Sequence, residues 1–166
     1  MYSSSLHSPI GILLIQADEV SVRSIQFVEN EIRQDPSELT EWAKIELSAY
    51  FEGKLSIFTF PMQQEGSPFQ QGVWQELQQI KPGCPISYSD LAKKLQNPLA
   101  IRAIAATNGK NKLLIAIPCH RVIGSKGDLV GYAGALWRKE WLLKHETKMT
   151  GIGQASLFQE YAYQPS

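Results

Sequence analysis

The sequence contains little of several features that define whole classes of protein. Its 166 residues include two cysteines, Cys84 and Cys119, too few for a disulfide scaffold. Its three histidines form no cluster with zinc-site spacing, so we expect no metal and no cofactor. The apolar run near the start, residues 10–15, is too short to span a bilayer, and no basic segment precedes it as in a secretory signal. We therefore expect a cytoplasmic protein without a membrane partner.

The formal net charge of zero conceals an uneven distribution of charge. Residues 1–80 carry four basic and eleven acidic residues, a net of −7, whereas residues 81–148 carry twelve basic and four acidic residues, a net of +8. A strongly basic region is typical of proteins that face a polyanion, so the second region is a candidate for nucleic-acid binding. On charge alone, a solvated basic face without a partner is an equally open alternative.

The first sixty residues predict a small unit of strands and one helix. Three stretches are alternating or apolar and favour strands: residues 10–15, 20–28 and 55–60. Asp35 followed by Pro36 predicts a helix start, with Asp35 as the N-cap, and Gly53 predicts the end of that helix. No residue here suggests chemistry, so we interpret residues 1–62 as an N-terminal α/β scaffold domain.

The second region begins with a helix and continues with a pair of short helices. Ser67 followed by Pro68, with Gln70 three residues after the serine, predicts a capped helix start. Helices are then expected over residues 89–96 and 98–108, and so tight a connection suggests a helix-turn-helix. The second of these is rich in alanine and carries Arg102, a combination that suits a DNA groove. Tight packing against a neighbouring helix would use alanine equally well.

A cysteine and a histidine follow the next apolar run. Residues 113–117 predict a buried strand, and Pro118 ends it directly before Cys119 and His120. A thiol is a nucleophile only as the thiolate, so Cys119 needs a base, and His120 is the nearest candidate. Glu146, near the end of a later helix, is a candidate to orient the histidine ring. For the dipeptide alone, an inert core cysteine remains the alternative.

Several short motifs occur together over about half the chain. They are Ile117-Pro118-Cys119-His120-Arg121-Val122, Gly131-Tyr132-Ala133-Gly134, Lys139-Glu140-Trp141-Leu142-Leu143 and, upstream, Ile86-Ser87-Tyr88 and Ala100-Ile101-Arg102-Ala103. In this order and spacing, the segment from Phe69 to Glu146 resembles the O6-alkylguanine-DNA alkyltransferases (methylated-DNA–protein-cysteine methyltransferases) of the bacterial Ogt-like type. The resemblance implies DNA repair by direct reversal. A methyl or other alkyl group would pass irreversibly from O6-alkylguanine, and from O4-alkylthymine, to Cys119, once per molecule.

The resemblance also implies roles for single residues at the reacting centre. Cys119 would accept the alkyl group, and His120 would take the thiol proton through a water. Glu146 would orient His120. Tyr88 would give a proton to the departing guanine, and Asn111 would brace the thiol segment against the helix-turn-helix.

The same resemblance implies how double-stranded DNA with alkylated bases would be held. The second helix of the helix-turn-helix would enter the minor groove, with Arg102 filling the gap left by the flipped-out nucleotide and with Ala103 and Tyr88 at the DNA. The flipped base would contact a short segment made of Tyr132, Ala133 and Gly134. Ala135 stands where the family commonly has a second glycine after this tyrosine motif.

Together these observations predict an α+β protein that acts as a monomer. It would have a small strand-rich N-terminal domain with a helix and a mainly helical C-terminal alkyltransferase domain, residues 67–148, containing the helix-turn-helix. Residues 149–166 form a tail without an assigned role. Three other functions remain open: a damage sensor that binds alkylated DNA without accepting the alkyl group, a cysteine hydrolase that turns over repeatedly, and a helix-turn-helix transcription factor with sequence preference.

Overall fold

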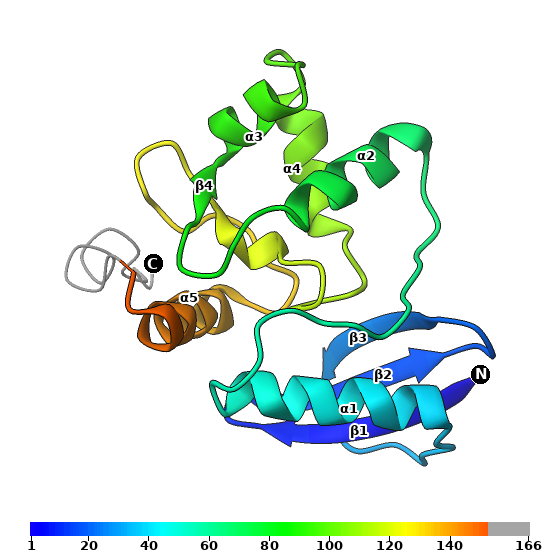
Figure 1. Ribbon diagram of the computed structural model, residues 1–166. Helices are drawn as coiled ribbons and strands as arrows, with labels where there is room; N and C mark the ends of the chain where they lie inside the picture. Colours follow the sequence, from blue (N-terminus) through cyan, green and yellow to red (C-terminus); the bar gives the residue numbers. More distant parts are fainter. Residues whose placement is uncertain (153–166) are drawn as a thin grey trace. The chain divides into compact units, whose positions relative to one another are not determined.

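The computed structural model describes residues 1–152, and these divide into two compact units (Figure 1). Unit 1 comprises Met1–Glu65 together with Lys112–Ala116, and unit 2 comprises Gly66–Asn111 and the described residues from Ile117 onward. A small antiparallel sheet with a helix forms most of unit 1, and helices dominate unit 2, which confirms the expected α+β fold class.

Unit 1 is a three-stranded antiparallel sheet with one helix against it. Its elements are β1 (Tyr2–Ser8), β2 (Gly11–Ala17), β3 (Val22–Val28) and α1 (Glu38–Phe51), and the strand order is β1-β2-β3. Ile15 pairs with Ile25 across β2 and β3, and both are fully buried with Leu47 of α1. The strand β1 was not expected, because its serine-rich sequence lacks apolar alternation. It is held by its pairing to β2 and by a buried hydrogen bond from Ser4 Oγ to Thr40 Oγ1 of 2.8 Å.

The helix α1 starts with a different cap from the one predicted. Ser37, and not Asp35, is the N-cap: its Oγ accepts a hydrogen bond from Thr40 N at 3.2 Å, and Thr40 Oγ1 accepts one from Ser37 N at 2.9 Å. This reciprocal pair satisfies two of the donors that a helix N-terminus leaves free. The prediction of Asp35 as the cap was therefore wrong by two residues.

The expected strand over residues 55–60 is absent. The carboxylate of Glu46, on α1, accepts hydrogen bonds from Thr59 N at 2.7 Å, Thr59 Oγ1 at 2.6 Å and Phe60 N at 3.3 Å. The Glu46 carboxylate thus accepts hydrogen bonds from backbone N–H groups that could otherwise donate to a neighbouring strand. The segment follows the helix as an irregular stretch.

The part of unit 2 that the structure describes, up to residue 152, consists of four helices and two very short strands around a single turn of 3-10 helix. The elements are α2 (Pro68–Leu77), β4 (Ile86–Ser87), α3 (Tyr88–Lys94), α4 (Ile101–Gly109), η1 (Cys119–Arg121), β5 (Val122–Ile123) and α5 (Leu136–Thr150). The start of α2 is confirmed, with Ser67 and Gln70 forming a reciprocal capping box. The packed pair α3 and α4 forms the helix-turn-helix, and α4 begins later than expected because a turn closed by Ala100 N and Asn97 O precedes it.

The apolar run over residues 113–117 is buried but is not a strand. Leu113 makes a single bridge to Ile25, and residues 112–116 belong to unit 1 and not to the predicted second domain, residues 67–148. Ile115 then adopts φ 72°, and Ala116 N donates to Leu114 O across 2.8 Å, so the chain turns at once. An apolar run indicates burial, and a tight turn in the core satisfies that pattern as well as a strand does.

The C-terminal end of the described chain is helical. α5 continues to Thr150 and ends at Gly151, which has the left-handed conformation that glycine tolerates. Most of the expected tail, residues 153–166, lies outside the described residues. Within residues 1–152, no helix is both long and apolar enough to cross a membrane.

Candidate active site around Cys119

The thiol of Cys119 lies at the start of η1, inside unit 2. Pro118 is the residue before this turn of helix, and the backbone N–H of Cys119 donates to Ile117 O at 2.8 Å. The cysteine is only 1% exposed. Burial raises the pKa of the Cys119 thiol, and the Asn111 hydrogen bond and the positive charge of Lys139 offset this only in part. The resting group is therefore a protonated thiol, which needs a base before it can react.

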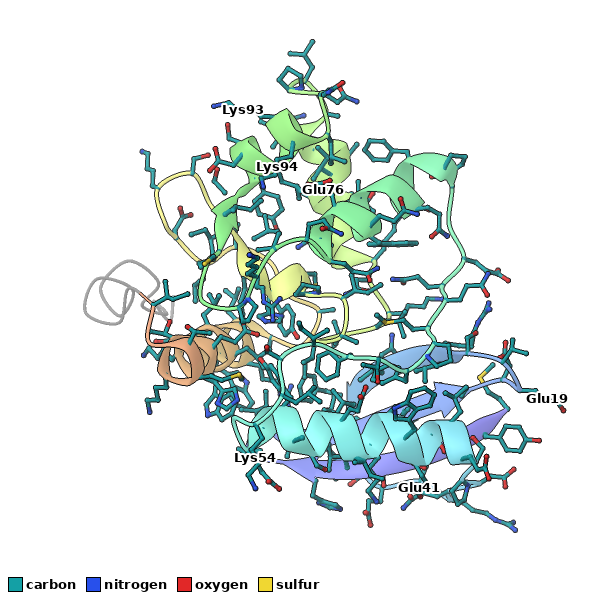
Figure 2. The ribbon with its side chains drawn as sticks, viewed as in Figure 1. Glu19, Glu41, Lys54, Glu76, Lys93 and Lys94 are labelled. Atoms are coloured by element: carbon teal, nitrogen blue, oxygen red, sulfur yellow. The ribbon has the colours of Figure 1, made fainter. Side chains whose placement is uncertain are left out.

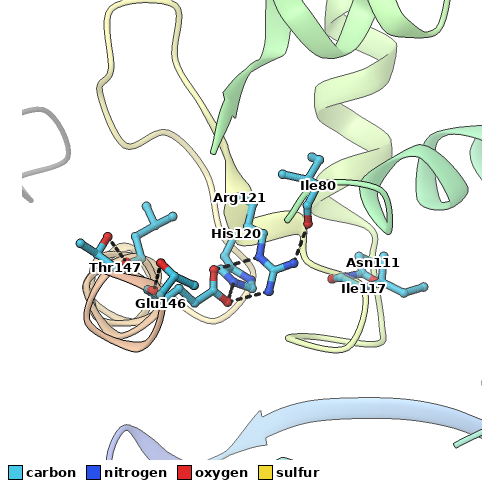
Figure 3. A network of polar contacts seen from close by, with 9 residues as sticks. Ile80, Asn111, Ile117, His120, Arg121, Glu146 and Thr147 are labelled. Atoms are coloured by element: carbon cyan, nitrogen blue, oxygen red, sulfur yellow. Dashed lines mark hydrogen bonds and ion pairs between the residues drawn. The ribbon is translucent and has the colours of Figure 1, made fainter. Parts of the chain in front are cut away.

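His120, the next residue, is held by a buried carboxylate (Figure 3). Its Nε2 lies 2.8 Å from Glu146 Oε2, and both side chains are fully buried. Burial alone would raise the pKa of Glu146, but His120 and Arg121 outweigh it and hold that pKa well below its usual range. An ionised carboxylate can only accept, so Nε2 carries the hydrogen and Nδ1 carries the lone pair. Burial lowers the pKa of His120, so the ring is a neutral base at pH 7.

Arg121 completes this network, although no role was predicted for it from the sequence. Its Nε and Nη2 each donate to Glu146 across 2.8 Å, and its Nη1 donates to Ile80 O at 2.7 Å. A bidentate guanidinium fixes the plane of the carboxylate and supplies the charge that keeps it ionised in the interior. One sequence signal could have indicated a role for Arg121, namely its position directly after Cys119 and His120. A charged residue beside a buried nucleophile needs a partner.

Two asparagines connect the thiol segment to the end of α4. Asn111 Nδ2 donates to Ile117 O at 2.8 Å, two residues before the thiol. Asn108 Nδ2 donates both to Cys119 O, at 3.2 Å, and to the Tyr88 hydroxyl, at 3.1 Å. No pattern in the sequence singled out Asn108. Burial raises the pKa of Tyr88, and the Asn108 hydrogen bond opposes this, so the phenol stays protonated at neutral pH.

A buried lysine holds the loop that leads into α5. Lys139 is 0% exposed, and its Nζ donates to Val130 O at 2.8 Å and Gly131 O at 3.1 Å. Burial lowers its pKa to about 8, although the nearby Cys119 acts in the opposite direction. The ammonium group thus fixes the backbone just before Tyr132 and places positive charge near the thiol. No role for Lys139 was foreseen from the sequence.

The three residues expected to contact the flipped DNA base, Tyr132, Ala133 and Gly134, differ in their exposure. The Tyr132 ring lies edge-on to His120 with 6.5 Å between centroids, and its hydroxyl is buried without a hydrogen-bond partner in the described structure. Ala133 is exposed and Gly134 is buried. Tyr132 therefore lies at the Cys119 centre, together with Tyr88, His120 and Glu146.

Arg102 lies elsewhere on the same unit. It is exposed on α4 beside the exposed Ala103, while Asn108 on the buried face of that helix reaches Cys119. The other exposed basic residues of this region are lysines, namely Lys93 and Lys94 on α3, labelled in Figure 2, and Lys110 after α4. The helix-turn-helix thus presents basic side chains outward and ties its inner face to the reacting centre.

Comparisons with known proteins assign both parts of the chain. Residues 68–148 match the DNA binding domain of 6-O-methylguanine DNA methyltransferase, and residues 1–64 match its ribonuclease-like domain. The methylated-DNA–protein-cysteine methyltransferase of Methanosarcina acetivorans is 38% identical over 153 residues, which cover 88% of this chain and 98% of that protein. The protein of the same name from Shigella flexneri is 41% identical over 142 residues, covering 80% and 81%. The crystal structure of Mycobacterium tuberculosis OGT in complex with DNA superimposes with a TM-score of 0.80 at 34% identity, covering 90% and 94%.

Proposed function

The chain belongs to the 6-O-methylguanine DNA methyltransferase family, and from that premise we propose that it repairs DNA by moving an alkyl group from O6-alkylguanine to Cys119. One observation carries the assignment of chemistry to these residues. His120 follows Cys119 directly in the sequence, and its Nε2 is hydrogen-bonded to Glu146. Its buried Nδ1 has no hydrogen-bond partner among the described residues. A neutral imidazole with one free lone pair is the base that a protonated thiol requires.

The proposed reaction is a direct displacement at carbon. The Cys119 Sγ–C bond forms as the C–O6 bond breaks, and the electron pair of the broken bond stays on the guanine. The thiol proton passes to His120 Nδ1 through a water, and the Tyr88 hydroxyl supplies the proton that the departing guanine takes up. One proton passes from the Cys119 thiol to His120, and one passes from Tyr88 to the guanine. The step is balanced once solvent carries a proton from His120 back to Tyr88.

The product would be a thioether, which fixes the stoichiometry. A thioether has no activated carbonyl for water to attack, so none of the residues around Cys119 would regenerate the thiol. Each molecule would act once. A hydrolase built on the same Cys119–His120 pair would cycle instead.

Unit 2 would also bind the DNA and hold the damaged nucleotide. Exposed lysines and Arg102 on the helix-turn-helix would contact the backbone without sequence preference, as suits a lesion that occurs anywhere. Since O6 lies inside the duplex, the nucleotide would be flipped toward Tyr132, Ala133 and Gly134, with Arg102 filling the gap and Ala103 at the groove. Asn111 would keep the thiol segment tied to α4 during this process. O4-alkylthymine is a second proposed substrate.

The reacting centre needs no second chain. Its proposed catalytic side chains, Cys119, His120, Glu146 and Tyr88, all come from unit 2 of one molecule. We therefore propose that the protein acts as a monomer. A DNA substrate accords with the expected cytoplasmic location.

Intact-protein mass spectrometry tests the proposal directly. Wild-type protein and Cys119→Ser are incubated with a duplex containing O6-methylguanine, with an unmodified duplex as the control. We expect the wild type alone to gain one methyl group, saturating at one equivalent and located on the peptide that contains Cys119. Binding without a change of mass would instead identify a damage sensor, and release of more than one equivalent of product would identify a turnover enzyme. A duplex containing O4-methylthymine tests the second substrate in the same way.

A further inference from the structure

We propose that Asn108 is a positioning residue that keeps the Tyr88 phenol available as the proton donor to the departing base and couples it to the backbone of Cys119. This inference rests on the proposed alkyl transfer and adds a residue to it. Asn108 lies on α4, Tyr88 begins α3, and Cys119 begins η1, so one side chain joins three elements of unit 2.

The orientation of the Asn108 amide follows from its partners. The group is 4% exposed, and its Nδ2 lies 3.2 Å from Cys119 O and 3.1 Å from Tyr88 Oη. A backbone carbonyl can only accept, so one amide hydrogen must point to Cys119 O. The other amide hydrogen then points to the tyrosine. A flipped amide would place its oxygen against the carbonyl and would be repelled.

This orientation decides which way the Tyr88 hydrogen bond runs. Because Nδ2 donates, the phenol oxygen accepts, and the phenol keeps its own hydrogen for another partner. Asn108 is the hydrogen-bond partner of this hydroxyl among the described residues, and none of them accepts its hydrogen. Tyr88 is therefore left as a donor toward whatever group enters the centre.

Packing alone does not explain an asparagine at this position. The Asn108 Oδ1 atom is buried and has no hydrogen-bond partner among the described residues, which is unfavourable for an amide oxygen. Leucine would fill a similar volume without burying an unpaired oxygen. The carbonyl of Cys119 would stay satisfied in that case, because it also accepts from the backbone N–H of Val122. What leucine would lose is the donor that sets the direction of the Tyr88 hydrogen bond.

Two methyl donors that differ in their need for a proton test the inference. An O6-methylguanine duplex requires protonation of the departing base, whereas methyl iodide reacts by forming the Sγ–C bond as iodide leaves with its electron pair. Single-turnover rates of Cys119 methylation are measured with each, the duplex being saturating. For Asn108→Leu we expect the duplex rate to fall about tenfold and the methyl iodide rate to stay within about twofold of wild type.

Companion variants separate positioning from damage to the fold. Asn108→Ala removes the same donor and guards against a packing effect of leucine. Thr107→Val, on the same helix, removes the half-buried hydrogen bond from Thr107 Oγ1 to Ala103 O and should leave both rates unchanged. In a Tyr88→Phe background, Asn108→Leu should cause no further loss, because its effect acts through that hydroxyl.

Each other result overturns the inference in a recognisable way. Equal losses with both methyl donors would mean that Asn108 acts on the thiol or the fold. Additive losses in the double variant would mean that it acts independently of Tyr88, and an unchanged duplex rate would remove it from the reaction. If the wild type itself transferred no methyl group from the duplex yet reacted with methyl iodide, the proposed function would fail, and the inference with it.

Discussion

Replacing Glu146 with glutamine tests the network that holds His120, because it removes one charge and keeps the shape of the side chain. In the wild type the carboxylate accepts two hydrogen bonds from Arg121 and one from His120, all at 2.8 Å and fully buried. Removing one partner of a buried ion pair leaves the other charge uncompensated, so Glu146→Gln should lower the free energy of unfolding by about 3 kcal/mol. The duplex transfer rate should fall about 100-fold, since the base loses its orienting acceptor.

Urea unfolding at several pH values measures the difference in free energy of unfolding between the wild type and Glu146→Gln, and the direction in which this difference changes with pH. The folded pKa of Glu146 lies below its unfolded value, so its contribution is fully present above about pH 4.3 and declines as the pH falls below that value. The wild type should therefore lose its advantage over Glu146→Gln on acidification. The control is Glu140→Gln on the same helix, whose partner Lys144 is 40% exposed and whose loss should cost about 0.5 kcal/mol or less. Equal stabilities of the two variants, or a wild-type transfer rate in Glu146→Gln, would refute this account.

Three further predictions concern the backbone and the pH profile. Ala135 adopts φ 83° and ψ 148°, a conformation that is strained for alanine and suited to glycine. Ala135→Gly should therefore raise the free energy of unfolding by about 1 kcal/mol in thermal unfolding, and a lowered melting temperature would show that no strain was relieved. Ser37→Ala should cost about 1 kcal/mol in the same assay and Asp35→Ala almost nothing; the reverse order would restore Asp35 as the cap. Because burial lowers the pKa of His120, the acid limb of the transfer rate should lie below about pH 6.5; a midpoint above that value would exclude a neutral, buried His120 as the base.

The features that could be predicted from the sequence are those whose causes lie close together in the chain. The cap of α2 was found because Ser67 and Gln70 are three residues apart and their hydrogen bonds are local. The Cys119–His120 pair was found for the same reason. Motifs in register over half the chain identified the family, and the local strand and helix patterns predicted the α+β class. Local signals also misled: the Asp35-Pro36 pair resembles a helix start, yet Ser37 has the reciprocal partner in Thr40.

The tertiary structure alone decided which side chains serve the thiol. Arg121 reaches Glu146 across 25 residues and Ile80 across 41, and Asn108 reaches Tyr88 across 20. No periodicity or spacing encodes such pairs, because a buried charge or amide is satisfied by whatever group the fold brings within hydrogen-bond reach. For the same reason residues 113–117, apolar enough for a strand, turn sharply at Ile115: hydrophobicity determines that a segment is buried, and its neighbours determine the path it takes.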